Sequence, residues 1–508
     1  MTTALSAGTA EKPQGWLVRD FAASIVVFLV AMPLCMGIAI ASGVPPEKGL
    51  VTGIIGGLVV GLLAGSPLQV SGPAAGLAVI VFELVREHGL AALGPILALA
   101  GLFQLAAGIF KLGGWFRAIS PAVVHGMLAG IGALIVVGQF HTLFDAKPLS
   151  SGLANLAAVP GRVMGLDPTN MASTEIALGI GLLTIALMIG WEKLRPAAMK
   201  LVPGALIGVV GATLVAWLGA LSVVRVSVPE SIAAAVTVPG ASFLGPLADP
   251  ALLLSALAIA FIASAETLLS AAAVDRMHDG VRTDYNKELR AQGIGNLLCG
   301  AVGALPMTGV IVRSSANVQA GATTRLSAIL HGVWILGFVA LLPWLLREIP
   351  MAALGGVLVV TGARLISLKH VQHLFAHYGV LPALIWAATF VLVVTTDLLT
   401  GVLAGLALSL IELAPHVRRL NLKVATNHNA ERSHVSLDGA ATFLSVPKLN
   451  KTLDALPEGK PLTIELHKVP AIDHSCAELL REWLGRQRKR GFEVELLGSP
   501  AHLRRLAA

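Results

Sequence analysis

The sequence predicts an all-α polytopic membrane domain followed by a small α/β domain. The chain of 508 residues is 55% hydrophobic and only 13% charged, whereas soluble globular domains carry about 25% charged residues. Apolar stretches of roughly 15 to 25 residues recur from Phe21 to about Leu413, enough for about fourteen membrane segments. After His416 the composition changes, because 15 of the 36 Lys and Arg residues lie in the last 93 positions.

The membrane segments are expected to be helices. The 54 glycines and only two tyrosines suit closely packed helices better than a barrel of alternating strands. The first apolar run, near Phe21, is too long for a cleavable signal sequence. We therefore expect a short cytoplasmic segment over 1–17, a membrane domain over 18–415 and a cytoplasmic domain over 416–508.

Two short Gly- and Pro-containing segments occupy matching places in the two halves of the membrane domain. Pro73 and Gly76 recur as Pro306 and Gly309, 233 positions later in both cases. In membrane proteins, paired interrupted helices of this kind point free N-terminal N–H groups at a site in the middle of the bilayer. The pattern predicts that the two segments bind an anion between them.

The same offset predicts a seven-plus-seven inverted repeat, with repeats over about 18–220 and 250–415. An odd number of spans in each half inverts the second half relative to the first. The connection Asn155–Asn170 is too polar to span a membrane, and Val226–Pro250 is expected to lie outside it.

The basic residues are explained by membrane topology and not by nucleic acid, although the formal net charge is +7. They fall in alternate short loops, as the positive-inside rule requires. These loops and both termini are therefore expected on the cytoplasmic side of the membrane. The residues are Lys111, Arg117, Lys193, Arg195, Lys200, Arg276, Arg282, Lys287, Arg290, Arg364 and Lys369.

The C-terminal segment reads as alternating strands and helices, which predicts a small α/β fold. The expected elements are strands over His434–Leu437, Leu462–Leu466 and Phe492–Leu497 and helices over Val446–Leu456 and Cys476–Arg490. Asp473 and Ser475 are candidate caps of the second helix.

Several motifs resemble the sulfate permease (SulP) family of anion transporters with a C-terminal STAS domain, and the resemblance covers nearly the whole chain. It implies a mobile core and a gate, a homodimer, and substrate held between the facing N-termini of segments three and ten. The motifs are Pro33 with Ala41-Ser-Gly-Val-Pro-Pro46, Gln69-Val-Ser-Gly-Pro73, Asp284-Tyr-Asn-Lys-Glu-Leu289, Gln292-Gly-Ile-Gly-Asn296, Arg313-Ser-Ser-Ala-Asn317, Gln319-Ala-Gly321 and Thr396-Asp-Leu-Leu-Thr-Gly401.

The chain departs from this family at two places. A hydroxyl often follows the segment-three proline in relatives that carry bicarbonate, whereas Ala74 and Ala75 stand here. Glutamines frequent in segment one are replaced by Ala31 and Leu34. The substrate hypothesis is sodium-coupled bicarbonate uptake, with proton-coupled sulfate or dicarboxylate transport as the alternative.

Candidate substrate-binding residues follow from the interrupted segments and the resemblance. Arg313, about one turn into segment ten, either adds positive charge beneath the anion or pairs with Glu266. Ser71 and Thr308 are candidate hydroxyl donors, although helix capping would also explain them. The full set is Ser71, Pro73, Ala74, Ala75, Gly76, Thr308, Gly309 and Arg313.

Glu266 is the candidate coupling residue, because an ionisable group inside an apolar span is costly unless it faces a cavity, a partner or an ion. The resemblance places it on segment eight beside the anion, and Ser270 shares its face of the helix. With Thr308, these groups would bind a sodium ion, or Glu266 would take up a proton; a structural glutamate is the remaining alternative.

Ser475 is a candidate regulatory site. Ile472-Asp-His-Ser475 resembles the STAS loop whose Ser or Thr is phosphorylated in anti-sigma-factor antagonists, and a phosphate would suit a helix N-terminus; an N-cap serine is the alternative. A cytoplasmic STAS-binding protein is the expected partner, beside lipid and a second copy of the chain. Beyond sodium we expect no metal or cofactor, since His125, His141 and His331 are scattered.

The function predicted is secondary active transport of a small inorganic or carboxylate anion, and not enzymatic catalysis. A passive anion channel, or a membrane sensor that signals through its STAS domain, is the alternative from another class. Glu266 discriminates between them in part, because a channel gains little from a carboxylate beside its anion.

Overall fold

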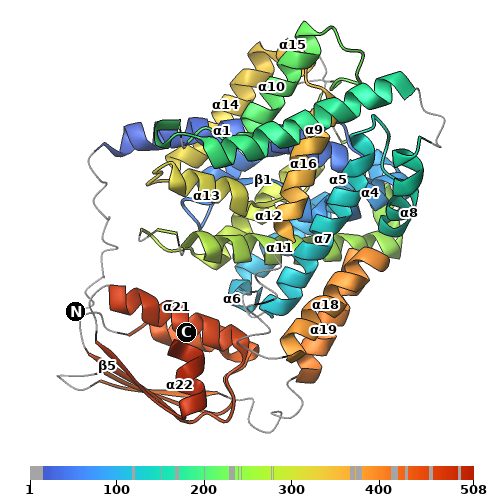
Figure 1. Ribbon diagram of the computed structural model, residues 1–508. Coiled ribbons are helices and arrows are strands. Elements are labelled where there is room, and N and C mark those ends of the chain that lie inside the picture. Colours follow the sequence, from blue (N-terminus) through green and yellow to red (C-terminus); the bar gives the residue numbers. More distant parts are fainter. Residues whose placement is uncertain are drawn as a thin grey trace. The chain divides into compact units, whose positions relative to one another are not determined.

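The computed structural model describes residues 15–507, apart from 117–119, 150, 166–170, 200, 228–234, 238, 242, 276, 279, 367–371, 373–379, 413–421, 429–432, 457–460 and 490–492. Most of the expected N-terminal segment 1–17 therefore lies outside the described residues. Helices dominate the chain up to Glu412, and a four-stranded sheet follows (Figure 1).

The first half of the membrane domain contains one short strand among its helices. Segment two is a single continuous helix with a π-helical turn, η1, in its middle. The elements are α1 (Trp16–Ala41), α2 (Pro46–Ile55), η1 (Gly56–Val60), α3 (Gly61–Leu63), β1 (Ser71–Pro73), the 3₁₀ turn η2 (Ala75–Leu77), α4 (Ala78–His88), α5 (Leu90–Ile109), α6 (Gly113–Phe116), α7 (Pro121–Thr142), α8 (Gly152–Val163), α9 (Met171–Leu194), η3 (Ala197–Met199) and α10 (Gly204–Leu218).

The second half repeats this pattern, with one short strand again before a short helix. Its elements are η5 (Gly245–Ala248), α11 (Pro250–Asp275), α12 (Tyr285–Ala301), β2 (Met307–Gly309), α13 (Ile311–Gln319), α14 (Leu326–Leu341), α15 (Pro343–Leu346), α16 (Met351–Leu365), α18 (Val380–Thr395) and α19 (Leu398–Glu412).

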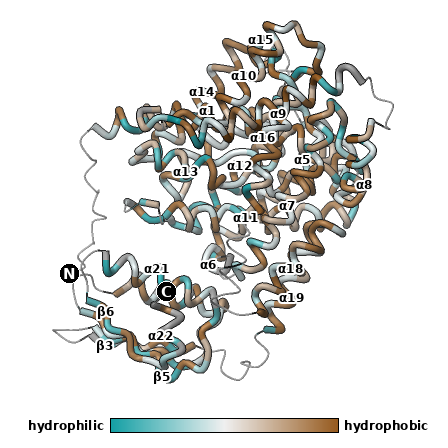
Figure 2. Tube along the Cα trace, viewed as in Figure 1, coloured by the Kyte–Doolittle hydropathy of each residue, from teal (hydrophilic) through white to brown (hydrophobic). Residues whose placement is uncertain are grey.

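The apolar helices make this chain a multi-pass membrane protein, as predicted. Among the described residues, six helices are long and apolar enough to cross a membrane and five shorter ones are apolar. With α12 and the short helices α4 and α13, the described segments number fourteen, half before the connection at 219–249 and half after it. Figure 2 shows the apolar helices mainly in hydrophobic colours, whereas α12 and α13 are paler. The short helix α8 forms part of the polar connection that was expected from Asn155 onwards.

The membrane domain packs as parts of two compact units that do not follow the repeat boundary. The first unit contains the chain up to Ile109, Gln139–Pro148 and Val159–Leu358; the second contains Phe110–Gly138, Leu149–Ala158 and the chain from Val359. The first unit thus combines α1 to α5 of one repeat with α11 to α14 of the other, and it contains both interrupted segments.

The C-terminal part is an α/β domain, as predicted from its alternating pattern. Its sheet has the order β3–β4–β5–β6; β3 is antiparallel to β4, and the other two pairings are parallel. The prediction missed β3, whose sequence KVATNH is mostly polar, and α22, whose apolar pattern is interrupted by two arginines. The elements are β3 (Lys423–His428), β4 (Ser433–Asp438), η7 (Phe443–Ser445), α20 (Val446–Asp454), β5 (Leu462–Lys468), α21 (His474–Lys489), β6 (Val494–Leu497) and α22 (Pro500–Ala507).

Candidate functional site

The two interrupted segments meet as an antiparallel pair of strands in the interior of the first unit. Ser71 pairs with Gly309 and Pro73 with Met307, and all six strand residues are buried. The chain leaves each strand into a short helix, and the α4 and α13 starts, Ala78 and Ile311, keep the 233-residue offset. The N-termini of the two helices therefore lie at opposite ends of one strand pair.

Neither short helix has a side-chain cap. The N-cap positions are Leu77 for α4 and Val310 for α13, and neither side chain accepts a hydrogen bond. The first N–H groups of a helix have no partner within the helix and carry the positive end of its dipole. Each end of the strand pair therefore lies beside the positive end of a helix dipole.

A polar stripe on α12 holds the strand pair in place. Asn296 is fully buried; its Oδ1 accepts from the backbone N–H of Met307 at 2.7 Å, and its Nδ2 donates to the carbonyl of the same residue at 3.1 Å. Gln292 donates to the hydroxyl of Ser71 at 2.6 Å and to Glu288 at 3.0 Å. Each of these three stripe residues lies one helical turn from the next.

The stripe residues Glu288, Gln292 and Asn296 belong to quoted motifs, but the sequence analysis assigned them no role. Their signal was present: three polar side chains at i, i+4 spacing on a helix among apolar neighbours predict one buried polar face. Because Ser71 receives the Gln292 amide, its hydroxyl is part of the scaffold.

Arg313 is the largest fully buried side chain of the described chain. It lies on the first turn of α13 and reaches back to β1, where a Cβ built on Gly72 would stand 2.0 Å from its Nη1 atom. None of its three guanidinium nitrogens has a hydrogen-bond partner among the described residues. A buried cation without a counter-charge is strongly unfavourable.

Thr308 and Gly309 place one more polar group beside the strands. The Thr308 hydroxyl is fully buried and, within the described part of the chain, unpartnered. The Gly309 N–H donates to the hydroxyl of Thr267 on α11 at 3.1 Å. A side chain at Gly309 would displace Gln69, because a Cβ there would lie 1.9 Å from its Nε2 atom.

Glu266 lies near the end of the strand pair formed by Pro73 and Met307, beside the start of segment three. A Cβ built on Gly76 would stand 2.6 Å from its Oε2 atom, and this buried oxygen has no hydrogen-bond partner in the described chain. Ser270, one turn further along α11, is also buried.

The alternative in which Arg313 pairs with Glu266 is wrong. No ion pair joins the two among the described residues. The physical reason is that Arg313 turns towards Gly72, in the middle of the strand pair, whereas Glu266 lies against Gly76 beyond its end.

The backbone of segment three is less open than expected. The N–H of Ala74 donates to the carbonyl of Pro306 at 3.2 Å, and the carbonyl of Ala74 accepts from Leu77 at 3.3 Å. Ala74 therefore extends the strand pairing. Pro73 pairs with Met307 and has no N–H to offer. Only Ala75 and Gly76 of the predicted set stand in the 3₁₀ turn before α4.

In the C-terminal domain, Asp473 and not Ser475 caps α21. The Asp473 carboxylate accepts from the backbone N–H of Cys476 at 2.9 Å and from that of Phe443. Withdrawal from water raises the pKa of Asp473 to about 7, against the lowering effect of these donors. The hydroxyl of Ser475 is buried and unpartnered in the described residues, so it is not an N-cap.

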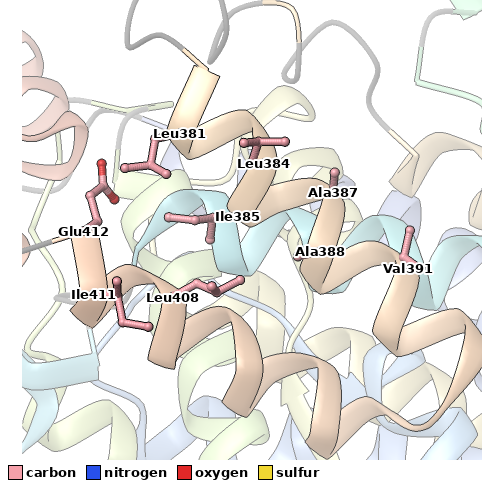
Figure 3. Close-up of a pocket in the computed structure, with 9 residues that line it drawn as sticks. All are labelled: Leu381, Leu384, Ile385, Ala387, Ala388, Val391, Leu408, Ile411 and Glu412. Atoms are coloured by element: carbon pink, nitrogen blue, oxygen red, sulfur yellow. The ribbon is translucent and has the colours of Figure 1, made fainter.

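A separate cavity of about 580 Å³ lies between α18 and α19 of the second unit. Figure 3 shows that leucine, isoleucine, alanine and valine side chains line it and that Glu412 marks one end. It contains none of the predicted site residues, and its apolar lining does not suit a small hydrated anion.

The fold and the site define a membrane transporter built from two repeats. An interrupted segment of each repeat contributes one strand to the buried pair β1–β2, beside which the positive charge of Arg313 lies. Residues 17–389 match the model of the sulfate permease family, and residues 424–508 match that of the "Mlab, STAS domain". The chain belongs to the sulfate permease family, and it is a transporter and not an enzyme.

Named relatives and solved structures agree with this placement. The Bacillus subtilis protein YvdB, provisionally named a sulfate transporter, is 30% identical over 94% of this chain and 91% of its own. The bicarbonate transporter BicA of Picosynechococcus is 26% identical over 76% and 68%.

Two solved structures share the fold. The transmembrane domain of a cyanobacterial BicA has a TM-score of 0.67 at 24% identity and covers 78% of this chain and 98% of its own. Murine Slc26a9, an anion transporter in an inward-facing state, has a TM-score of 0.66 at 17% identity, over 96% and 86%.

Proposed function

We propose that this protein is a secondary active transporter that takes up a small oxyanion, bicarbonate in the first place, across a bacterial inner membrane. The observation that carries the proposal is the buried guanidinium of Arg313, which has no partner in the described chain. It lies between two uncapped helix N-termini, so charge and dipoles favour an anion at the same place.

The residues beside the strand pair suit a small oxyanion. Ala74 and Ala75 line the start of segment three, and Thr308 offers one free hydroxyl from the facing strand. A bicarbonate ion can accept hydrogen bonds from both Thr308 and the Arg313 fork, which suits a planar oxyanion. The names of the relatives support sulfate and bicarbonate as the substrates to compare.

Coupling runs through Glu266 in this proposal. Its Oε2 atom lacks a protein partner among the described residues, and Ser270 and Thr308 supply further oxygens of the kind that hard cations prefer. A sodium ion bound there would offset the carboxylate and strengthen anion binding next to it. Transport follows when the core moves against the gate with both ions bound.

The full proposal includes cytoplasmic termini, a homodimer and a cytoplasmic partner for the STAS domain. Ser475 remains its regulatory residue. Because its hydroxyl is buried, a kinase would reach it only after the start of α21 opens.

Purified protein in liposomes tests this function. Radiolabelled bicarbonate, sulfate and fumarate are offered with and without inward sodium or proton gradients. We expect saturable bicarbonate accumulation driven by sodium, lost in Glu266→Gln while the protein keeps its elution profile and thermal stability.

Unchanged accumulation in Glu266→Gln would remove the coupling assignment. Large voltage-driven flux that ignores both chemical gradients would favour a channel instead.

A further inference from the structure

His331 on α14 is a fully buried imidazole with one ring nitrogen unused. Its Nδ1 atom lies at hydrogen-bond distance from the carbonyl of Ala328, one turn earlier, while Nε2 has no partner in the described residues. Because a carbonyl only accepts, Nδ1 carries the proton and Nε2 keeps a free lone pair. An ionisable group enclosed in a membrane segment is costly to keep and suggests a function.

One layer of backbone separates His331 from the strand pair. A Cβ built on Gly57 of the π-helical turn η1 would stand 3.0 Å from Cε1 of His331. A Cβ on the preceding Gly56 would stand 2.5 Å from the carbonyl oxygen of Ser71. The turn η1 therefore touches the imidazole on one side and β1 on the other, and π-helical turns are frequent at functional sites.

Arg313 is the charged group on the other side of this turn. Its guanidinium lies against Gly72, whose backbone nitrogen would be 3.2 Å from a Cβ built on Gly56. Cys35 of α1, a buried thiol, lies against Gly53 on the same side of segment two as Gly57. The positive charge opposes a second positive charge on His331 as long as no anion is present.

The other ionisable groups on the helices around α14 are engaged or distant. Asp20 of α1 accepts from the backbone and hydroxyl groups of Thr323 and Thr324. Arg19 of α1 is exposed, and Arg325 at the start of α14 donates to the carbonyl of Leu62. Glu47 and Lys48 stand at the opposite end of α2 from η1, and η1, α3 and α15 carry no ionisable residue. Anion occupancy beside Arg313 is therefore the event that changes the field at His331.

We propose that His331 takes up one proton on Nε2 when an anion occupies the site beside Arg313. The inference rests on the proposed function of that site. The proton comes from the solution, from hydronium or a buffer acid, and no other group of the protein changes its bonds. A bound anion offsets the guanidinium charge, so the imidazolium becomes tolerable, and by linkage the proton strengthens anion binding in return.

The direction of the pH effect follows from this linkage. Protonation accompanies binding, so affinity must rise as pH falls, by up to about tenfold per pH unit for one linked proton. A site in which Glu266 alone binds sodium would show no such dependence for an anion of constant charge.

Titration calorimetry on the full-length protein in detergent measures the linked proton directly. Sulfate and nitrate are the probes, because their charge does not change between about pH 5.5 and 8, where histidine titrates. Binding heats in buffers of different ionisation enthalpy give the number of protons taken up per anion.

His331→Asn is the matched variant. The asparagine amide can still donate a hydrogen bond to the Ala328 carbonyl, as Nδ1 of the histidine does, but it has no nitrogen that titrates. We expect wild type and Glu266→Gln to take up protons on binding, approaching one per anion towards the lower end of this pH range. His331→Asn should bind with no uptake, and His331→Gln provides a second variant if that one does not fold.

Proton uptake that persists in the histidine variants, or that disappears only in Glu266→Gln, would overturn the proposal. So would wild-type binding with no uptake, a result that needs no variant. If wild type binds neither sulfate, nitrate nor bicarbonate, the proposed function fails, and this inference fails with it.

Discussion

The guanidinium of Arg313 lies against the Cα of Gly72, on the strand that pairs with its own. A Cβ at position 72 would stand 2.0 Å from Nη1 and 3.0 Å from the central carbon of the guanidinium. Arg313 therefore occupies the space that a side chain at position 72 would fill. This contact joins the two repeats where β1 and β2 pair.

Gly72→Ala should displace Arg313 and weaken anion binding by at least about tenfold, since an error near 1 Å in a binding group costs this much or more. Equilibrium binding of radiolabelled sulfate or bicarbonate measures the loss. Gly337→Ala on α14 is the control, because a Cβ there meets no atom within 4 Å. Equal affinity in the two variants would contradict the role given to this contact.

Arg313→Met should abolish uptake while leaving thermal stability unchanged or higher. The substitution keeps much of the aliphatic volume but removes a buried charge that has no partner in the described chain, and replacing buried charges by apolar side chains is often neutral or stabilising. Thermal unfolding and liposome uptake test the two halves of this prediction. A marked loss of stability would show that Arg313 is paired within the protein.

Thr308→Val and Thr267→Val should have opposite signatures. The Thr308 hydroxyl has no described partner, so its loss should lower anion affinity by roughly tenfold, as expected for a hydrogen bond to a charged group, without lowering stability. The Thr267 hydroxyl receives the Gly309 N–H, so its loss should lower stability by about 1–3 kcal/mol. Thermal unfolding and binding measured on both variants separate these roles.

The stability of the STAS domain should fall as pH rises from about 4 to 7. The pKa of Asp473 is raised from 3.8 to about 7 in the fold, so the fold favours the protonated carboxyl. The stabilisation is present below the unfolded value and is lost as pH rises through the folded one, by at most about 1.4 kcal/mol per pH unit.

Hydrogen exchange of peptides from α21, corrected for intrinsic rates, measures this loss in the full-length protein. Asp473→Asn should remove the pH dependence, whereas Asp438→Asn, at an exposed position at the end of β4, should retain it. A dependence that survives in Asp473→Asn would assign it to another group.

Much of the scaffold was predictable because its signals are local or periodic. The apolar runs required membrane helices, and the 233-residue offset located both interrupted segments. The alternating pattern after His416 predicted the α/β domain, although it did not predict the strand β3 or the helix α22. Asp473 was a correct cap candidate because capping needs only the residues that follow it.

The membrane class, the repeat and the positions of the two breaks were thus determined by the sequence itself, because hydropathy and Gly/Pro content act along the chain. Only the tertiary structure decided that Arg313 turns to Gly72 and not to Glu266, and that Gln292 engages Ser71. Those outcomes depend on how α11, α12 and α13 are rotated against the strand pair. Helix rotation is set by packing between residues more than 190 positions apart, and no local pattern records it.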